Sequence, residues 1–150
     1  MARSLNKTAL SATLHCLFGC SIGEVLGMIL SSYWSLAAAP SIIISIMLAF
    51  VFGYGLSMRP LLAHGLPFKK AMRLALAADT ASIGAMEFTD NAFVLAVPGA
   101  ISAGLNTLLF WWSLLVSLAI AFLVAFPLNR WLIARGKGHA VVHEYHKGHH

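Results

Sequence analysis

Lys and Arg residues fall into three short segments of the chain, at residues 3–7, 59–73 and 130–147. The two stretches between these segments, residues 8–58 and 74–129, contain neither residue type and are predominantly apolar. A helix needs roughly 20 residues to cross a hydrocarbon layer of about 30 Å. Each stretch therefore has room for two crossings. The pattern predicts four transmembrane helices, at about residues 8–30, 36–58, 74–97 and 106–131.

The third predicted helix, at about residues 74–97, has two interpretations. It is either one long helix from Pro67 to Val97, or a basic amphipathic helix with Lys69, Lys70 and Arg73 followed by a shorter membrane span. Proline suits the first turn of a helix, and Pro98 followed by glycine suits its end. The pattern alone leaves both interpretations open.

Four crossings place all ten Lys and Arg residues on one side of the membrane. The positive-inside rule makes that side the cytoplasm, so both termini are expected inside. We therefore expect an all-α, multi-pass protein of the cell membrane, a four-span helical bundle with residues 1–135 as its transmembrane domain. Residues 136–150 would form a cytoplasmic tail that holds five of the seven histidines. Such a tail is either a metal-binding segment or a solvated extension.

The composition supports the membrane assignment and excludes several other classes. Hydrophobic residues make up 59% of the chain and charged residues 10%, whereas soluble domains carry about 25% charged residues. Two cysteines are too few for a disulfide scaffold. The basic residues lie at the predicted membrane interfaces, so they do not indicate a nucleic-acid partner. The chain has no nucleophile elbow, zinc-protease motif or phosphate-binding loop, so nothing in it indicates an enzyme.

Small residues recur every four positions on three of the predicted helices. The first helix carries Gly19, Gly23 and Gly27, and similar rows of Ser and Ala lie at 41–53 and 113–125. Small side chains allow helix backbones to approach closely in lipid, where there is no hydrophobic driving force between helices. We expect a tightly packed bundle in contact with the lipid bilayer. We also expect a homo-oligomer, because four short helices leave little room for a transport path within one subunit.

Acidic residues are rare in this sequence, and four of the five fall in or beside the predicted spans: Glu24, Asp79, Glu87 and Asp90. An ionisable group at membrane depth costs at least about 2–3 kcal/mol, so it tends to face the protein interior and to have a role. Asp79 and Asp90 are eleven residues apart and share one helix face with Met86. Glu24, Glu87 and Asp90 are all expected in the outer half of the membrane, where they could form a carboxylate site. Asp79 would lie nearer the cytoplasm as a relay.

Cys16 and Cys20 are separated by one helical turn, and Glu24 continues their row. Two thiols at this spacing could bind a soft cation such as Cu(I), with His15 or Met86 completing the set. The alternative is that cysteine acts here as a small apolar residue in a packed helix.

The acids also have two interpretations. Asp90, in Thr89-Asp90-Asn91, could cap a break in the helix, and the others could pair with nearby Ser, Thr or Asn residues. A functional role is the other interpretation, because neither stretch that carries these acids contains Lys or Arg. Buried carboxyl groups without an internal cation either bind a cation or stay protonated.

Two motifs resemble those of a known family. The run from Leu14 to Glu24 resembles the opening motif of a bacterial membrane family termed domain of unknown function number 4396. Ala78-Asp79-Thr80-Ala81-Ser82-Ile83, Met86-Glu87-Phe88-Thr89-Asp90-Asn91 and Pro98-Gly99-Ala100 resemble its second motif. The resemblance extends from about Thr8 to Trp131 and implies a compact bundle in the bacterial inner membrane, with a loose association with copper or heavy-metal handling. It marks seven distinguishing positions: His15, Cys16, Cys20, Glu24, Asp79, Glu87 and Asp90.

The function we expect is binding or transport of a cation, a transition-metal ion such as copper or zinc, through an intramembrane site. The expected metal ligands are His15, Cys16, Cys20, Glu24, Asp79, Met86, Glu87 and Asp90. The alternative is a structural or accessory membrane subunit whose buried acids are protonated and bind no ion. A membrane enzyme that uses the carboxyl groups and His15 as acid–base groups is a third hypothesis.

Overall fold

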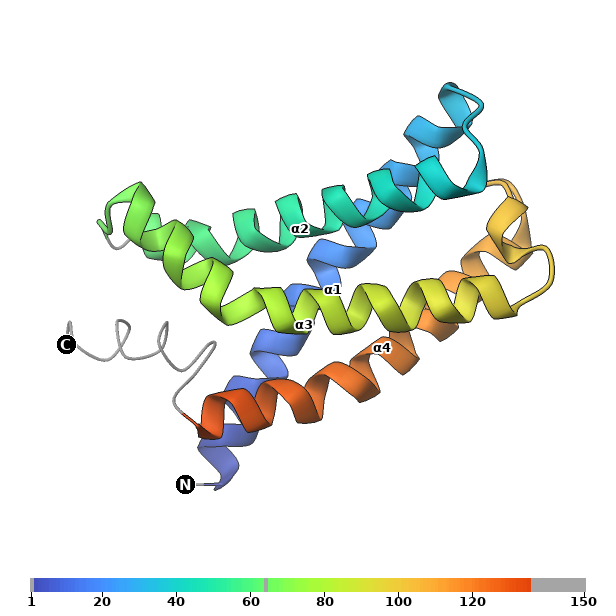
Figure 1. Ribbon diagram of the computed structural model, residues 1–150. Helices are drawn as coiled ribbons and strands as arrows, with labels where there is room; N and C mark the ends of the chain where they lie inside the picture. Colours follow the sequence, from blue (N-terminus) through green and yellow to red (C-terminus); the bar gives the residue numbers. More distant parts are fainter. Residues whose placement is uncertain (1, 64, 136–150) are drawn as a thin grey trace.

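The computed structural model describes residues 2–63 and 65–135, and it forms four long helices joined by short turns. They are α1 (Ala2–Tyr33), α2 (Ala38–Ala63), α3 (Phe68–Ala96) and α4 (Leu108–Ala134), with a single 3₁₀ turn, η1 (Ala100–Ser102), before α4. Figure 1 shows the chain passing back and forth, so that α1 and α3 run in one direction and α2 and α4 in the other. The described residues contain no strand, which confirms the all-α class. The His-rich tail expected at 136–150 lies outside the described residues.

The helices extend beyond the apolar stretches that predicted them. α1 begins at Ala2 and includes Lys7, while α3 begins at Phe68 and includes Lys69, Lys70 and Arg73. A helix backbone keeps its hydrogen bonds on both sides of a membrane boundary, so hydropathy marks a crossing but not the end of a helix. The third segment is therefore one long helix rather than two.

The interpretation of Asp90 as a helix cap is wrong, because α3 continues past it to Ala96. The polar residues on either side of Asp90 bond to their own helix. Thr89 Oγ1 donates to Ala85 O at 2.8 Å, and Asn91 Nδ2 donates to Glu87 O at 2.8 Å. These bonds follow the helical turn and leave Asp90 in the middle of a regular helix.

Glycine brings α1 and α2 into backbone contact. A Cβ atom on Gly19 would lie 2.7 Å from the Cα of Gly53, and one on Gly23 would overlap the backbone of Ala49. One on Gly27 would overlap Ser45. The glycine row of α1 therefore packs against α2 within one chain.

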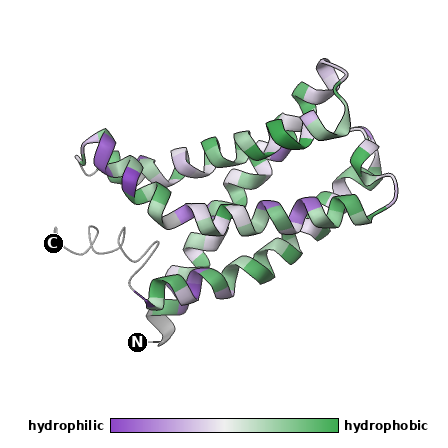
Figure 2. Cartoon of the chain, viewed as in Figure 1, coloured by the Kyte–Doolittle hydropathy of each residue, from purple (hydrophilic) through white to green (hydrophobic). Residues whose placement is uncertain are grey.

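The bundle is apolar outside, and polar side chains lie inside it beside an apolar core. Phe88 is 78% exposed, whereas Asp79, on the same helix, is 0% exposed. Large apolar side chains are exposed on every long helix, while the buried polar side chains include serines and Asn129. Figure 2 shows strongly hydrophilic ribbon at the start of α3 and in separate short segments further along the helices. Exposed apolar and buried polar side chains suit an apolar solvent.

Candidate functional site

The polar side chains of α1 and α3 meet in three successive levels along the bundle. The two helices run in the same direction, so residue numbers increase in the same direction along both. Cys16 faces Asp79, Cys20 faces Glu87 and Glu24 faces Asp90. We call these six residues the α1–α3 row. The structure thus brings together six of the eight residues that the sequence proposed as ligands.

The first level of the row is fully enclosed. The Cys16 thiol donates to Asp79 Oδ1 at a sulfur–oxygen distance of 3.8 Å, and the Ser57 hydroxyl of α2 reaches the same carboxyl group. Ser82, one turn after Asp79 on α3, is buried beside them. A weak thiol donor and a hydroxyl donor thus satisfy much of the hydrogen-bonding capacity of Asp79.

A second polar cluster, the Asn129 network, adjoins this level from α4. Asn129 Nδ2 donates to Thr13 Oγ1 at 3.0 Å and to Ser82 Oγ at 2.9 Å. Thr13 Oγ1 in turn donates to Ala9 O at 2.7 Å. One amide therefore joins α1, α3 and α4, and both of its N–H groups have partners.

The second level of the row pairs Cys20 with Glu87. Both side chains are buried, and the thiol lies close to the carboxyl group. Within the described residues, neither oxygen of Glu87 has a hydrogen-bond partner at regular geometry. Met86 and both cysteines belong to the same buried cluster, so two thiols and one thioether are close to this level.

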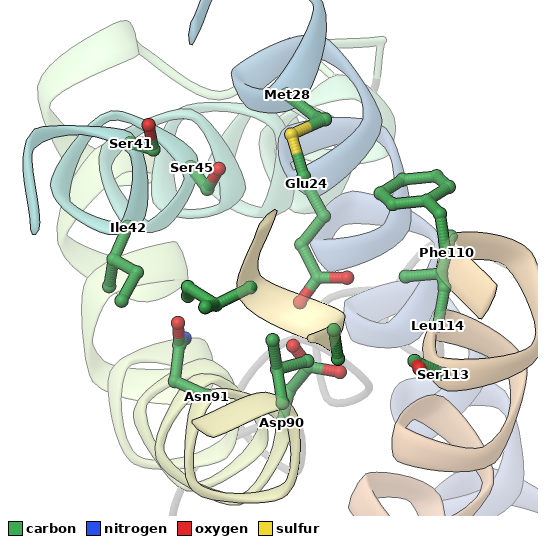
Figure 3. Close-up of a pocket in the computed structure, with 13 residues that line it drawn as sticks. Glu24, Met28, Ser41, Ile42, Ser45, Asp90, Asn91, Phe110, Ser113 and Leu114 are labelled. Atoms are coloured by element: carbon green, nitrogen blue, oxygen red, sulfur yellow. The ribbon is translucent and has the colours of Figure 1, made fainter. Parts of the chain in front are cut away.

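The third level is a pair of carboxyl groups beside a cavity of about 80 Å³. Figure 3 shows Glu24 of α1 and Asp90 of α3 pointing toward one another across it. Glu24 Oε1 and Asp90 Oδ1 are buried and receive no hydrogen bond from any described group, and the same is true of Ser113 Oγ on the α4 wall. Buried polar atoms usually have partners, so three unpaired oxygens at one cavity require an explanation.

His15 and Met86 are the two proposed ligands outside the row. His15 is exposed, and its Nε2 lies 3.1 Å from Leu56 O on α2. A step of one residue turns a helix by about 100°, which places His15 on a different face from Cys16. Met86 is buried with the cysteines, but it does not face a carboxyl group of the row in any described contact.

No three His, Cys, Asp or Glu side chains within residues 2–63 and 65–135 converge closely enough to hold one metal ion. The row offers its groups in pairs instead: two thiol–carboxyl pairs and one carboxyl–carboxyl pair. Pairs at successive depths suit a cation or proton that passes between them better than an ion held permanently at one closed site.

Sequence reasoning missed Ser57, Ser82, Ser113 and Asn129. Ser113 lies in the row of small residues at 113–125, which predicts helix packing, and Asn129 lies within the predicted span at 106–131. A polar residue at the inward position of an otherwise apolar helix is a usable signal, because lipid-facing positions exclude it. Its partners, however, come from other helices and cannot be found from one sequence.

These features define an all-α protein with a polar interior. Three of its helices are long and apolar enough to cross a membrane: α1 from Leu5 to Tyr33, α2 and α4. The chain belongs to the family described as a domain of unknown function (DUF4396), which matches residues 5–138. This match confirms the resemblance seen in the two sequence motifs. No curated protein and no solved structure matches the chain.

Proposed function

We propose that this chain is a multi-pass protein of the cell membrane that binds a cation and moves it along the α1–α3 row. All four long helices would cross the membrane, α3 included. Its three acids interrupt its apolar stretch, but each of them faces the bundle interior rather than the lipid. A polar group on a membrane helix is tolerated when it is buried against other helices.

The basic residues support an orientation with both termini in the cytoplasm. Arg59 lies near the end of α2, and Lys69, Lys70 and Arg73 lie at the start of α3, so these four share one end of the bundle. Arg130 Nε donates to Asn6 Oδ1 at 2.7 Å, which joins the start of α1 to the end of α4. The cavity lies toward the opposite end, where α1 connects to α2. The positive-inside rule would place the cavity on the outer side.

One observation carries the proposal: Glu24, Glu87 and Asp90 place carboxyl oxygens without hydrogen-bond partners inside the bundle. The stretches 8–58 and 74–129, which contain all three acids, have no Lys or Arg to neutralise them. Uncompensated buried carboxylates are strongly unfavourable, so either protons or a bound cation must neutralise them. A protein that only needed stability would use apolar side chains at these positions.

The proposal that the cation is copper or zinc depends on fewer ligands than the sequence offered. With His15 outside the row, the soft donors near one another are Cys16, Cys20 and Met86. Sulfur donors suit Cu(I), and sulfur with carboxylate donors suits Zn(II). A transition metal therefore remains one outcome of the transport experiment.

Transport by the full-length chain in lipid vesicles tests the proposal. Vesicles would be incubated with Na⁺, Ca²⁺, Zn²⁺ or Cu(I), separated from free ions and analysed for their metal content. We expect one of these ions to accumulate in protein-containing vesicles but not in empty ones. Loss of a charged ligand costs about 1.5–3 kcal/mol, so Glu87→Gln should slow the uptake at least about tenfold.

His15→Ala is the matched control, because His15 lies on α1 next to Cys16 but outside the row. It should leave the uptake unchanged. Equal uptake by protein-containing and empty vesicles for all four ions would contradict the transport function. An equal loss of ion uptake in Glu87→Gln and His15→Ala would show that the α1–α3 row is not the transport path.

The Asn129 network favours a second candidate, in which buried polar groups serve only to fix helix packing. Both N–H groups of Asn129 and the hydroxyl groups of Thr13 and Ser82 have partners, as expected for a structural role. In that case Glu24 and Asp90 would be protonated spacers, and no ion would bind to the purified protein. The vesicle measurement separates the two functions.

A further inference from the structure

The wall of the cavity beside Glu24 and Asp90 carries oxygen atoms that have no hydrogen-bond partner among the described groups. α1, α2, α3 and α4 all contribute to it, together with η1. Three of its oxygen atoms have no hydrogen-bond partner among the described groups, and each comes from a different helix: Glu24 Oε1, Asp90 Oδ1 and Ser113 Oγ. Asp90 is only 5% exposed, so this carboxyl group is enclosed rather than solvated.

One further oxygen donor lies on the same wall. Asn91 uses its amide nitrogen to bond to Glu87 O, so the amide oxygen is the atom left for another contact. Ser41 and Ser45 of α2 also line the cavity, but Figure 3 shows their hydroxyl groups pointing away from Glu24 and Asp90. Neither cysteine of the row lines the cavity, and Met28 is the one sulfur-bearing side chain among the residues that do.

We infer that this cavity binds a hard cation, an alkali or alkaline-earth ion, through oxygen atoms of Glu24, Asp90 and Ser113. Carboxylate, hydroxyl and amide oxygens are the donors that hard cations prefer, whereas soft cations prefer sulfur. The inference rests on the proposed function and names the class of cation at the outer end of the row.

The charges at the cavity support a cation rather than a neutral ligand. The titratable groups that face it are Glu24 from α1 and Asp90 from α3, with Glu87 of α3 close by. The walls from α2, η1 and α4 supply only hydroxyl and apolar groups. Two adjacent carboxyl groups in an enclosed site favour a ligand that brings positive charge.

The size of the cavity is compatible with such a ligand. A volume of about 80 Å³ has room for an ion with a few water molecules. Water would complete the coordination shell, since Na⁺ and Ca²⁺ need more oxygen atoms than the three unpaired ones.

Binding of ²²Na⁺ and ⁴⁵Ca²⁺ to the purified full-length protein tests the inference. The protein would be held in detergent with choline chloride as the background salt. We expect saturable binding of one of the two ions. Asp90→Asn should abolish it, and Ser113→Ala should weaken it about five- to tenfold, as expected for loss of one neutral ligand.

Ser117→Ala is the matched control for Ser113→Ala. Ser117 is buried one turn further along α4, but its hydroxyl donates to Leu114 O at 2.9 Å and it does not line the cavity. It should leave ion binding unchanged. The thermal unfolding of each variant would show that it is folded.

Two results would overturn the inference. They are the absence of saturable binding of either ion and equal weakening by Ser113→Ala and Ser117→Ala. If Zn²⁺ or Cu(I) were transported while neither hard cation bound, the inference would fail and the proposed function would stand. If no ion bound or moved, both would fail.

Discussion

Two polar regions lie inside this bundle, and they differ in how completely their hydrogen bonds are formed. In the Asn129 network, the amide donates to Thr13 and Ser82, and Thr13 donates to a backbone carbonyl. At the cavity, Glu24 Oε1, Asp90 Oδ1 and Ser113 Oγ have no partner among the described groups. Asn129 is 1% exposed and Asp90 5%, so burial does not explain the difference.

The difference separates two uses of a buried polar group. A fully bonded network fixes the rotation of each helix against its neighbours, and its loss leaves unpaired donors in an apolar interior. Under the proposed function, the cluster of unpaired oxygens lowers stability until a cation binds to it. Mutations in the first region should therefore change unfolding, and mutations in the second should change binding.

The largest effect on stability is expected where the backbones of α1 and α2 touch. Gly23→Val would force side-chain atoms into the backbone of Ala49, which cannot move without separating α1 from α2. Overpacking of this kind costs about 3 kcal/mol. Unfolding in detergent would measure it, with Gly55→Val as the control, because a Cβ atom on Gly55 would have no neighbour within 4 Å among the described residues. Equal stability of the two variants would show that the α1–α2 contact is not tight.

The next largest effect is expected at the centre of the Asn129 network. Asn129→Ala removes two hydrogen bonds and leaves a cavity, so the free energy of unfolding should fall by about 2 kcal/mol. Asn106→Ala, at an exposed asparagine, should change it by less than about 0.5 kcal/mol. Similar changes in the free energy of unfolding for the two variants would show that the Asn129 network has no structural role.

A smaller effect is expected at the edge of the same network. Thr13→Val keeps the shape of the side chain but removes the acceptor for one N–H of Asn129. We expect a loss of about 1 kcal/mol. Thr89→Val is the control, because the hydroxyl of Thr89 bonds only within its own helix in the described contacts. A loss at Thr89 as large as that at Thr13 would show that the bond between helices adds nothing.

The smallest effect on stability is expected at the cavity. Asp90→Asn has nearly the same shape and removes one of two adjacent acids, so without added Na⁺ or Ca²⁺ the free energy of unfolding should stay within about 0.5 kcal/mol of the wild type. The same variant should lose cation binding. If instead it were destabilised as much as Asn129→Ala, the two regions would have the same role, and the comparison would be wrong.

The sequence predicted the helices well and their partners less well. Unbroken apolar stretches without Lys or Arg indicate crossings, because a charged side chain is unfavourable at any depth inside the membrane. Helix periodicity placed Asp79 and Asp90 on one face and Cys16, Cys20 and Glu24 on another, and these two faces meet in the structure. Their role in cation binding stays a prediction.

The failures of sequence reasoning have one physical origin. His15 is adjacent to Cys16 in sequence, yet the helical turn directs it to Leu56 on the outside of the bundle. Ser113 and Asn129 have ordinary neighbours in sequence, and their importance comes from helices that are distant in the chain. Periodicity defines the faces of one helix, whereas the relative rotation of two helices depends on packing that no single segment encodes.

The backbone contact between α1 and α2 also has a consequence for the order of assembly. These two helices are consecutive in the chain, and contacts between nearby segments form early. Synthesis adds to this order, because the N-terminal part of a chain is made first. We expect the α1–α2 hairpin to be complete while α3 is still being synthesised. Its thiols and Glu24 would then already be in place when the three acids of α3 arrive. The three acids would make α3 unfavourable in lipid on its own. We therefore expect α3 to pack, as it forms, against the polar surface of the α1–α2 hairpin.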